Sequence, residues 1–368
     1  MLVVTALSSN TSLGGAVTAA AAARAGLCRP TKLEGLAVTE RDGPVPVIGH
    51  AVPTVRGFQG VARLLSLALP ALQALIDDAT LPSDEDVGLF LALPSLPLPE
   101  VTAEVDPEVE PEPRPKQAPP PAPADVQATR LVDRLVGLSG LRVAANLRRT
   151  FAFGHASFGL ATQAALTAVA RREVKVCVLG AVDSLCDPRA LGALLAQDRL
   201  KTEDNPDGLQ PGEASIFLVV TTGEEALRRR TSGLARITGA GVAREPRPPK
   251  DPVLGEGMML AIENLIEGTG PLAKGRTFFV VDCNGESRRA VDWGSCQQRL
   301  TAAMPGVLDV PEWFPAINFG DTGAASAGLA AQMVIRSFAR RHAPRPCAVV
   351  LSSSDDGGRS AIRIEQEG

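Results

Sequence analysis

Short continuous apolar runs alternate along the chain with longer stretches in which apolar residues recur at helical spacing. Such runs are typical of buried strands, and such spaced stretches are typical of buried helices. The runs predict strands at Leu2–Leu7, Asp86–Leu93, Leu141–Leu147, Val174–Leu179 (closed by Gly180), Ala214–Thr221, part of Glu224–Ala240, Thr277–Asp282, Ala348–Leu351 and Ala361–Ile364. The spaced stretches predict a helix ending at Ala25 and helices at Gly60–Asp77, Asp125–Leu138, Gly159–Ala170, Leu191–Leu200, Gly257–Glu267, Trp293–Ala303 and Asn318–Arg341, with Gly35–Val55 irregular.

The stretch from Phe151 to Leu185 is the clearest unit of this pattern: a glycine turn, a helix rich in small residues, and an apolar strand. A helix that starts from a tight turn presents free backbone N–H groups and the positive end of its dipole. Enzymes with α/β folds often place a nucleophile or an anion there. The residues at this position are His155, Ala156 and Ser157.

The second half of the chain repeats this pattern. Gly320 and Asp321 open another helix rich in Ala, Gly and Ser, much as Gly154 and His155 do in the first half. Repetition of strand–helix units in two halves predicts a duplicated α/β fold. The proline-rich linker Pro246–Pro252 divides the chain into halves at residues 1–245 and 246–368.

One segment, residues 94–124, differs in composition from the rest. Prolines occur throughout it, acids cluster from Glu100 to Glu112, and Pro119–Pro121 is a run of three prolines. A segment of this kind is extended and solvated and cannot form a core. It is either a surface insertion, which loops accept at little cost, or a strap that docks a partner.

Composition narrows the function classes. The chain has 368 residues, 45% of them hydrophobic, and a net charge of −4, which does not favour binding to nucleic acid. Its six cysteines show no metal-binding spacing, and Cys177, Cys283 and Cys347 lie in or beside apolar runs. With no secretory leader and no apolar stretch long enough to cross a membrane, we expect a cytoplasmic protein without membrane contact.

Several motifs resemble the β-ketoacyl synthase branch of the thiolase superfamily over nearly the whole chain. VVTALSSNTSLGGAV is similar to that family's first strand and loop, and GHASFGLATQAAL…GAVDSL to its nucleophile helix and following strand. DRLKTEDNPDGLQPGEASIFLVV is the most specific match, and DCNGESRRAVDWG, INFGDTGAASAG and SSSDDGGRSAIRIE fall where the family has two histidine loops and a gating loop. The resemblance implies a thiolase-like fold: duplicated βαβαβαββ halves in an α-β-α-β-α arrangement.

The residues at the family's functional positions differ from its pattern. The resemblance places His155 at the nucleophilic cysteine, Asn284 at the first histidine, Asp321 at the second, Ala316 at the lysine, and Asp356 at the gating phenylalanine before Gly357 and Gly358. Claisen condensation needs a thiolate and groups that stabilise an enolate and an oxyanion. We therefore predict that these positions are not catalytic, and that the protein has no cofactor and no metal.

If the fold holds, His155, Asn284 and Asp321 should meet in one pocket. An imidazole beside a carboxylate can act as a general base or as part of a triad, with Ser157 as the nucleophile. The alternative is that these polar groups only satisfy one another in a relic pocket.

Three hypotheses follow. The first is a non-catalytic homodimeric scaffold or adaptor, accessory to type VI secretion effector loading, a process linked to the DCNGES…DWG and GDTGAA motifs by resemblance alone. The family dimerises beside the nucleophile helix, so Leu141–Leu147 and that helix would form a two-fold interface. The second is an acyltransferase, similar to a 3-oxoacyl-ACP synthase, or a hydrolase, with altered His155/Asp321 chemistry. The third is a chain-length-factor-like partner of an active ketosynthase or of an acyl carrier protein.

Overall fold

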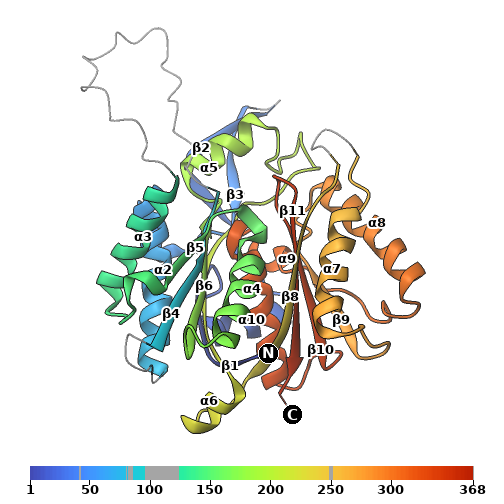
Figure 1. Ribbon diagram of the computed structural model, residues 1–368. Coiled ribbons are helices and arrows are strands. Elements are labelled where there is room, and N and C mark those ends of the chain that lie inside the picture. The colour runs from blue at the N-terminus through green and yellow to red at the C-terminus, as the bar shows by residue number, and fades with distance from the viewer. Residues whose placement is uncertain (41–42, 80, 82–85, 96–123, 248–251, 368) are drawn as a thin grey trace.

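The computed structural model describes residues 1–40, 43–79, 81, 86–95, 124–247 and 252–367 (Figure 1). The Pro/Glu-rich segment 94–124 and the linker Pro246–Pro252 therefore lie largely outside the described residues. The main sheet has nine strands in the order β5-β4-β6-β7-β1-β8-β11-β10-β9, and β2 and β3 form a separate hairpin. The bounds of the strands are β1 Leu2–Thr11, β2 Thr31–Glu40, β3 Gly43–Gly49, β4 Val87–Ala92, β5 Arg148–Phe151, β6 Val176–Ser184, β7 Glu213–Thr221, β8 Ala235–Arg244, β9 Thr277–Val281, β10 Cys347–Ser353 and β11 Gly358–Gln366.

The order of the strands shows the duplication. On one side β5, β4 and β6 run parallel, β7 is antiparallel to β6, and β1 follows β7. On the other side β9 and β10 run parallel, β11 is antiparallel to β10, and β8 follows β11. The two sides meet where β1 pairs with β8 over three residues. Strand β8 thus pairs along its length with β11 of the second half, and the division at residue 245 stays a prediction.

Three hydrophobic cores separate the layers of helices and sheet. The central core joins α4 and α10 to strands of both sides, the second lies under α2 and α3, and the third under α7 and α8. Figure 1 shows the same order across the molecule, from α2 and α3 through the sheet to α7 and α8. The bounds of the helices are α1 Ala16–Arg24, α2 Gly60–Asp78, α3 Ala124–Ser139, α4 Ser157–Ala170, α5 Pro188–Ala196, α6 Gly223–Arg228, α7 Glu256–Thr269, α8 Ser287–Ala303, α9 Ala316–Phe319 and α10 Ser326–Ala339.

The small residues of α4 allow the two sides to pack closely around it. A Cβ added at Gly159 would lie 2.2 Å from Cβ of Ser360 on β11, so a larger residue would push the helix away from that strand. The large side chain of Phe158 is fully buried in the same central core. The helix predicted at Gly159–Ala170 is thus confirmed and begins two residues earlier.

Several expected elements differ from the structure. Leu141–Leu147 is not a strand: it is irregular and ends in a short 3-10 helix, and the strand β5 follows it. Gly35–Val55, expected to be irregular, contains most of the β2–β3 hairpin in spite of its prolines. Gly180 does not close a strand, because β6 continues through it to Ser184. Residues 224–228 belong to helix α6, and only β8 supplies the strand expected in that region.

Helix α2 corrects the expectation that no apolar stretch reaches membrane-spanning length. This helix of 19 residues contains an 18-residue window with a mean hydropathy of 1.4, enough by length and composition to cross a bilayer. In the structure Leu67, Leu72 and Leu75 on this helix are fully buried in a core shared with β4 and α3. Pro70 lies within the helix, as predicted.

Candidate functional site

Two glycine turns bring the first and second halves of the chain together. His155 lies in a 3-10 turn, η4 (Gly154–Ala156), directly before α4. Asp321 lies just before the matching turn, η5 (Gly323–Ala325), which leads into α10. Gly154 and Gly320 have φ angles of +64° and +68°, a backbone region that glycine enters without strain. The two turns therefore aim His155 and Asp321 at one another.

Asp321 is the centre of the polar cluster. One of its carboxylate oxygens accepts hydrogen bonds from Nε2 of His155 at 2.7 Å and from the backbone N–H of Gly323 at 2.8 Å. The other accepts from Nδ2 of Asn284 at 2.6 Å. Burial works against the charge of this carboxylate, but His155, Arg289 and Asn284 outweigh it and hold the pKa of Asp321 well below its usual range. The predicted meeting of His155, Asn284 and Asp321 is confirmed.

His155 is held between Asp321 and an arginine. Nη2 of Arg289 lies 3.3 Å from both ring nitrogens of His155, and the side chain of His155 is only 8% exposed. Burial and the positive charge of Arg289 lower the pKa of His155, but the adjoining Asp321 carboxylate raises it more, and the net result lies above 6.5. The imidazole is therefore held towards its protonated form.

Arg289, which the sequence analysis missed, ties the cluster to the second half of the chain. Its Nη1 donates to Asp282 at the end of β9 over 2.7 Å, and the same Asp282 oxygen accepts from the backbone N–H of Ser353. Its Nη2 lies 3.6 Å from Asp355. The pair Arg288–Arg289, directly after the DCNGES motif, was the only sequence signal for an arginine at this site. In the structure Arg289 is buried and Arg288 is exposed, a difference that the sequence does not indicate.

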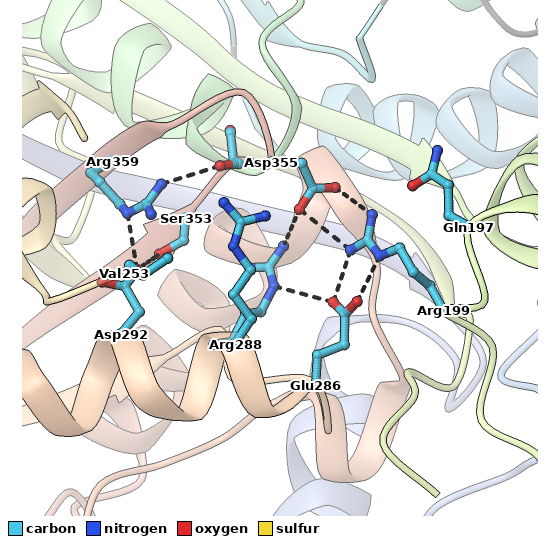
Figure 2. Close-up of a pocket in the computed structure, with 11 residues that line it drawn as sticks. Gln197, Arg199, Val253, Glu286, Arg288, Asp292, Ser353, Asp355 and Arg359 are labelled. Carbon is cyan, nitrogen blue, oxygen red and sulfur yellow. Dashed lines mark hydrogen bonds and ion pairs between the residues drawn. The ribbon is translucent and has the colours of Figure 1, made fainter. Parts of the chain in front are cut away.

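Arg289 is also one of the residues that line a charged cavity of about 400 Å³, and Figure 2 shows this cavity with Arg199, Glu286 and Asp355 around it. Arg199 closes one wall, with two hydrogen bonds to Glu286 at 2.6 and 2.8 Å and two to Asp355 at 2.8 and 3.3 Å. Figure 2 shows Arg359 and Asp292 on the opposite wall, where Nε of Arg359 donates to Asp292 over 3.0 Å. We call this space the site cavity. Its lining includes Arg289 but not His155.

Ser157 does not join the cluster. Its hydroxyl accepts from the backbone N–H of Phe153 at 2.8 Å and donates to the carbonyl of Leu93 at 3.2 Å. Ser157 has no exposed surface, and no hydrogen bond links it to His155 within the described part of the chain. Its contacts are those of a serine that fixes a turn.

The loop expected to act as a gate, at Asp356, Gly357 and Gly358, has two neighbouring acids with different contacts. Asp356 is half-exposed and accepts from the backbone N–H of Gly358, within a turn in which Gly357 has φ +94°. The neighbouring Asp355 is the residue that contacts Arg199 and Arg289. Ser354 receives the backbone N–H of Ala156 on its hydroxyl at 2.8 Å, so this loop covers the turn that carries His155.

Solved structures resemble this chain over its whole length, although no family model and no curated protein matches it. A β-ketoacyl synthase from Burkholderia phymatum STM815 has 16% identity and a TM-score of 0.76, with 100% of this chain and 99% of that chain covered. The ketosynthase from module 6 of the bacillaene synthase from Bacillus subtilis 168 has 12% identity and a TM-score of 0.76, with 100% and 72% covered. The ishigamide ketosynthase/chain length factor has 19% identity and a TM-score of 0.69, with 100% and 99% covered. The fold is that of the ketosynthases.

None of the six cysteines lies in the turn Gly154–Ala156 that carries His155. Cys177 and Cys186 are buried, and burial raises the pKa of both thiols well above the usual value. Cys283 lies closest to the cluster in sequence, and burial followed by the charge of Asp282 raises the pKa of its thiol to about 12. These thiols are protonated at neutral pH and are poor nucleophiles.

The ketosynthase-fold site also contains a carboxyl group that the sequence analysis did not single out. Asp183, at the end of β6, accepts from the backbone N–H groups of Ser184 at 2.6 Å and Ala324 at 2.7 Å and so holds η5 in place. Burial raises its pKa to about 6, although both amides oppose the rise. Among the described residues, no group of three or more His, Cys, Asp and Glu side chains could hold a metal ion, and the expectation of no metal stays a prediction.

Proposed function

We propose that this protein is a non-catalytic member of the ketosynthase-fold proteins and acts as a dimeric scaffold. The observation that carries this proposal is the closed polar cluster at His155. The imidazole bonds to Asp321 on one side, lies under Arg289 on another, and stands where the resemblance assigns the acyl-carrying cysteine.

The chemistry of the cluster supports the same conclusion. A histidine acts as a nucleophile or base through a free ring lone pair. Protonation removes that lone pair, and the raised pKa of His155 favours protonation. The Asp321 carboxylate is likewise bonded to three donors, which occupy most of its lone-pair sites. The cluster therefore has the character of a satisfied structural network.

The first experiment tests for acyl transfer directly. Purified protein is incubated with acyl-CoA and with an acylated carrier protein, and intact mass and thiol release are measured for the wild type and for His155→Ala. We expect no adduct and no turnover above the background in either protein. Turnover by the wild type that is lost in His155→Ala would overturn the proposal and favour the altered acyltransferase.

The dimer is proposed from the free edge of the sheet. Strand β5 is an edge strand that pairs only with β4 among the described residues, whereas the opposite edge, β9, is covered by backbone hydrogen bonds to Trp313 at 2.9 and 3.0 Å. An uncovered edge strand is open to pairing with a second chain. Phe153, two residues after β5, is 51% exposed, as an apolar interface residue would be in the free protomer. The strand expected at Leu141–Leu147 begins at Arg148 instead, so we propose the pairing at β5, directly after the segment predicted from the sequence.

Phe153→Asp should dissociate this dimer, because a carboxylate would be buried without a partner at the interface. The measurement is the molar mass by light scattering over a range of protein concentrations. Leu227→Asp is the matched control: it places the same charge on α6 at a residue that is 81% exposed and away from β5. A wild-type monomer would argue against the homodimer, and a Phe153→Asp dimer as stable as that of the wild type would argue against pairing at β5.

A partner ketosynthase or carrier protein is the second proposal. One similar structure is a ketosynthase/chain length factor, and another is a type II PKS acyl-carrier protein in complex with its ketosynthase. A chain-length-factor-like subunit would use the same β5 edge to pair with a different chain, so a stable monomer at high concentration would favour it over the homodimer. The role in type VI secretion effector loading stays a prediction of the sequence.

A further inference from the structure

A second cavity, of about 510 Å³, lies between the β2–β3 hairpin, the start of α2 and the start of α5, at the end of the molecule where Figure 1 shows β2, β3 and α5. We call it the hairpin cavity. Its lining combines apolar groups, among them Phe58 and Pro188, with the cations Arg29, Lys32, Arg56 and Arg63. No acidic side chain is among the described residues that line it. Its volume is in the range of small-molecule sites.

One of these cations is fully neutralised. Arg63 is buried and forms two hydrogen bonds to Glu213, at 2.7 and 2.9 Å, and one to Ser184 at 3.0 Å. Glu213 also accepts from the backbone N–H of Val52 and from Ser184, so both of its oxygens are satisfied. The nearby Asp187 is occupied by the backbone N–H groups of Gly60 and Arg189. The carboxylates of Glu213 and Asp187 therefore bond to Arg63 and to backbone N–H groups, and they do not neutralise Arg29 or Lys32.

Arg29 and Lys32 are different. Their side chains form no hydrogen bond or ion pair in the described part of the chain, and both are exposed at the cavity. Arg56 also lines the cavity and already has a partner. The two unpaired cations are three residues apart in the sequence, at the start of β2. No acidic side chain among the described residues that line the cavity is available to pair with them. This leaves an uncompensated positive charge facing a concave space.

Phe58 supplies the apolar counterpart. Its ring is 45% exposed although it lines the cavity, and Pro188 at the first position of α5 lines the same space. An exposed aromatic face in a cavity can take a planar or apolar group, while nearby cations hold an anion. Arginine and lysine together are well suited to binding phosphate. The planar guanidinium of arginine can donate two hydrogen bonds to phosphate oxygens, and the ammonium of lysine supplies a compact positive charge.

We propose that the hairpin cavity binds a small organic phosphate, with its phosphate at Arg29 and Lys32 and its planar or apolar part on Phe58. This site lies in a different part of the chain from the His155 cluster and does not depend on the protein being a non-catalytic scaffold. Binding here would fix the hairpin against α2 and α5 and would give the protein a ligand-dependent surface.

The test is calorimetric titration of the full chain at low salt with AMP, pyrophosphate, adenosine and citrate. We expect AMP and pyrophosphate to bind, with an affinity that falls as salt is added, and adenosine and citrate to bind at least about tenfold more weakly. Arg29→Gln/Lys32→Gln should weaken AMP and pyrophosphate by about tenfold or more, since two charge-assisted contacts are lost. Phe58→Ala should weaken AMP alone.

Arg130→Gln/Arg134→Gln is the matched control. These two arginines are exposed on α3, form no ion pair in the part of the chain that the structure describes and do not line the hairpin cavity, so the variant loses the same charge elsewhere. Equal losses of AMP binding in both double variants would mean general attraction to surface charge and would overturn the site. Absence of AMP and pyrophosphate binding to the wild type, or citrate binding as tight as that of pyrophosphate, would overturn it as well. Circular dichroism of each variant separates lost binding from lost folding.

Discussion

Charged side chains gather both around His155 and around the hairpin cavity, but only the first group is paired. Arg289 touches Asp282, Asp355 and His155 and is almost completely buried, and Asp321 has three donors. At the hairpin cavity Arg29 and Lys32 are exposed and without partners in the described chain.

The difference has a physical cause. A charge removed from water has to be matched by an opposite charge and by hydrogen bonds, or it shifts its pKa and becomes neutral. A charge at a concave surface keeps its water and stays available to a ligand. We therefore expect the His155 cluster to matter for stability and the hairpin cavity to matter for binding.

The largest effect is expected from breaking the buried pair. Asp321→Ala leaves His155, Nδ2 of Asn284 and the Gly323 amide without their acceptor. Removing one member of a buried ion pair costs about 3–5 kcal/mol, so the free energy of unfolding in urea should fall by about that amount. Asp309→Ala is the control, because its 2.8 Å pair with Arg345 is partly exposed and should contribute less than about 1 kcal/mol. Equal effects from the two variants would contradict the comparison.

A smaller effect is expected from pH. The folded pKa of His155 lies above its ordinary value of 6.5, so the charged imidazole stabilises the fold fully below pH 6.5. This contribution is lost as the pH rises through the folded pKa. Unfolding free energies measured between pH 6 and pH 9 should therefore decline in the wild type. His155→Gln, which does not titrate, should be less stable at pH 6 but should lack this part of the decline. If the unfolding free energies of the two proteins change in parallel with pH, the decline in the wild type does not come from His155.

The smallest effect is expected at the hairpin cavity. Arg29→Gln/Lys32→Gln removes two cations that have no partner, so the free energy of unfolding should stay within about 0.5 kcal/mol of the wild type. The measurement is the same urea titration in phosphate-free buffer. A loss comparable to that of Asp321→Ala would mean that these cations have a structural partner.

Secondary structure could be predicted where the periodicity of apolar residues was strong. The prediction failed where polar residues, prolines or an apolar composition favoured a different element from the one that forms. Helix α8 begins at Ser287, six residues before the predicted start, because its first turns are polar and show no apolar spacing. Pro44 and Pro46 favoured irregular structure, yet β3 accommodates them because it pairs with β2 alone, outside the main sheet. Leu141–Leu147 has a strand-like composition, but its Leu141 and Val143 pack into the core under α2 and α3 without joining the sheet.

The candidate site shows the same limit at the level of single residues. His155, Asn284 and Asp321 could be expected to meet, because the resemblance placed all three at one site. Arg289 and Asp355 could not, because each stands beside a residue of the same type, and no sequence pattern tells which member of the pair faces inward. Asp355 contacts Arg199 and Arg289 at the site, whereas Asp356 lies 4.0 Å from the exposed Arg244.

The sequence by itself determined the duplicated α/β architecture and the presence of a histidine at the start of α4, because hydrophobic periodicity and residue identity are local properties. Only the tertiary structure decided which charges are paired. His155 and Asp321 are 166 residues apart, and His155 and Arg289 are 134 apart. Contacts of this kind depend on how the two halves close around α4 and α10. The raised pKa of His155 and the lack of ion-pair partners for Arg29 and Lys32 in the described chain both follow from that closure. Each depends on which charges lie within a few ångströms of the side chain and on how much water still surrounds it.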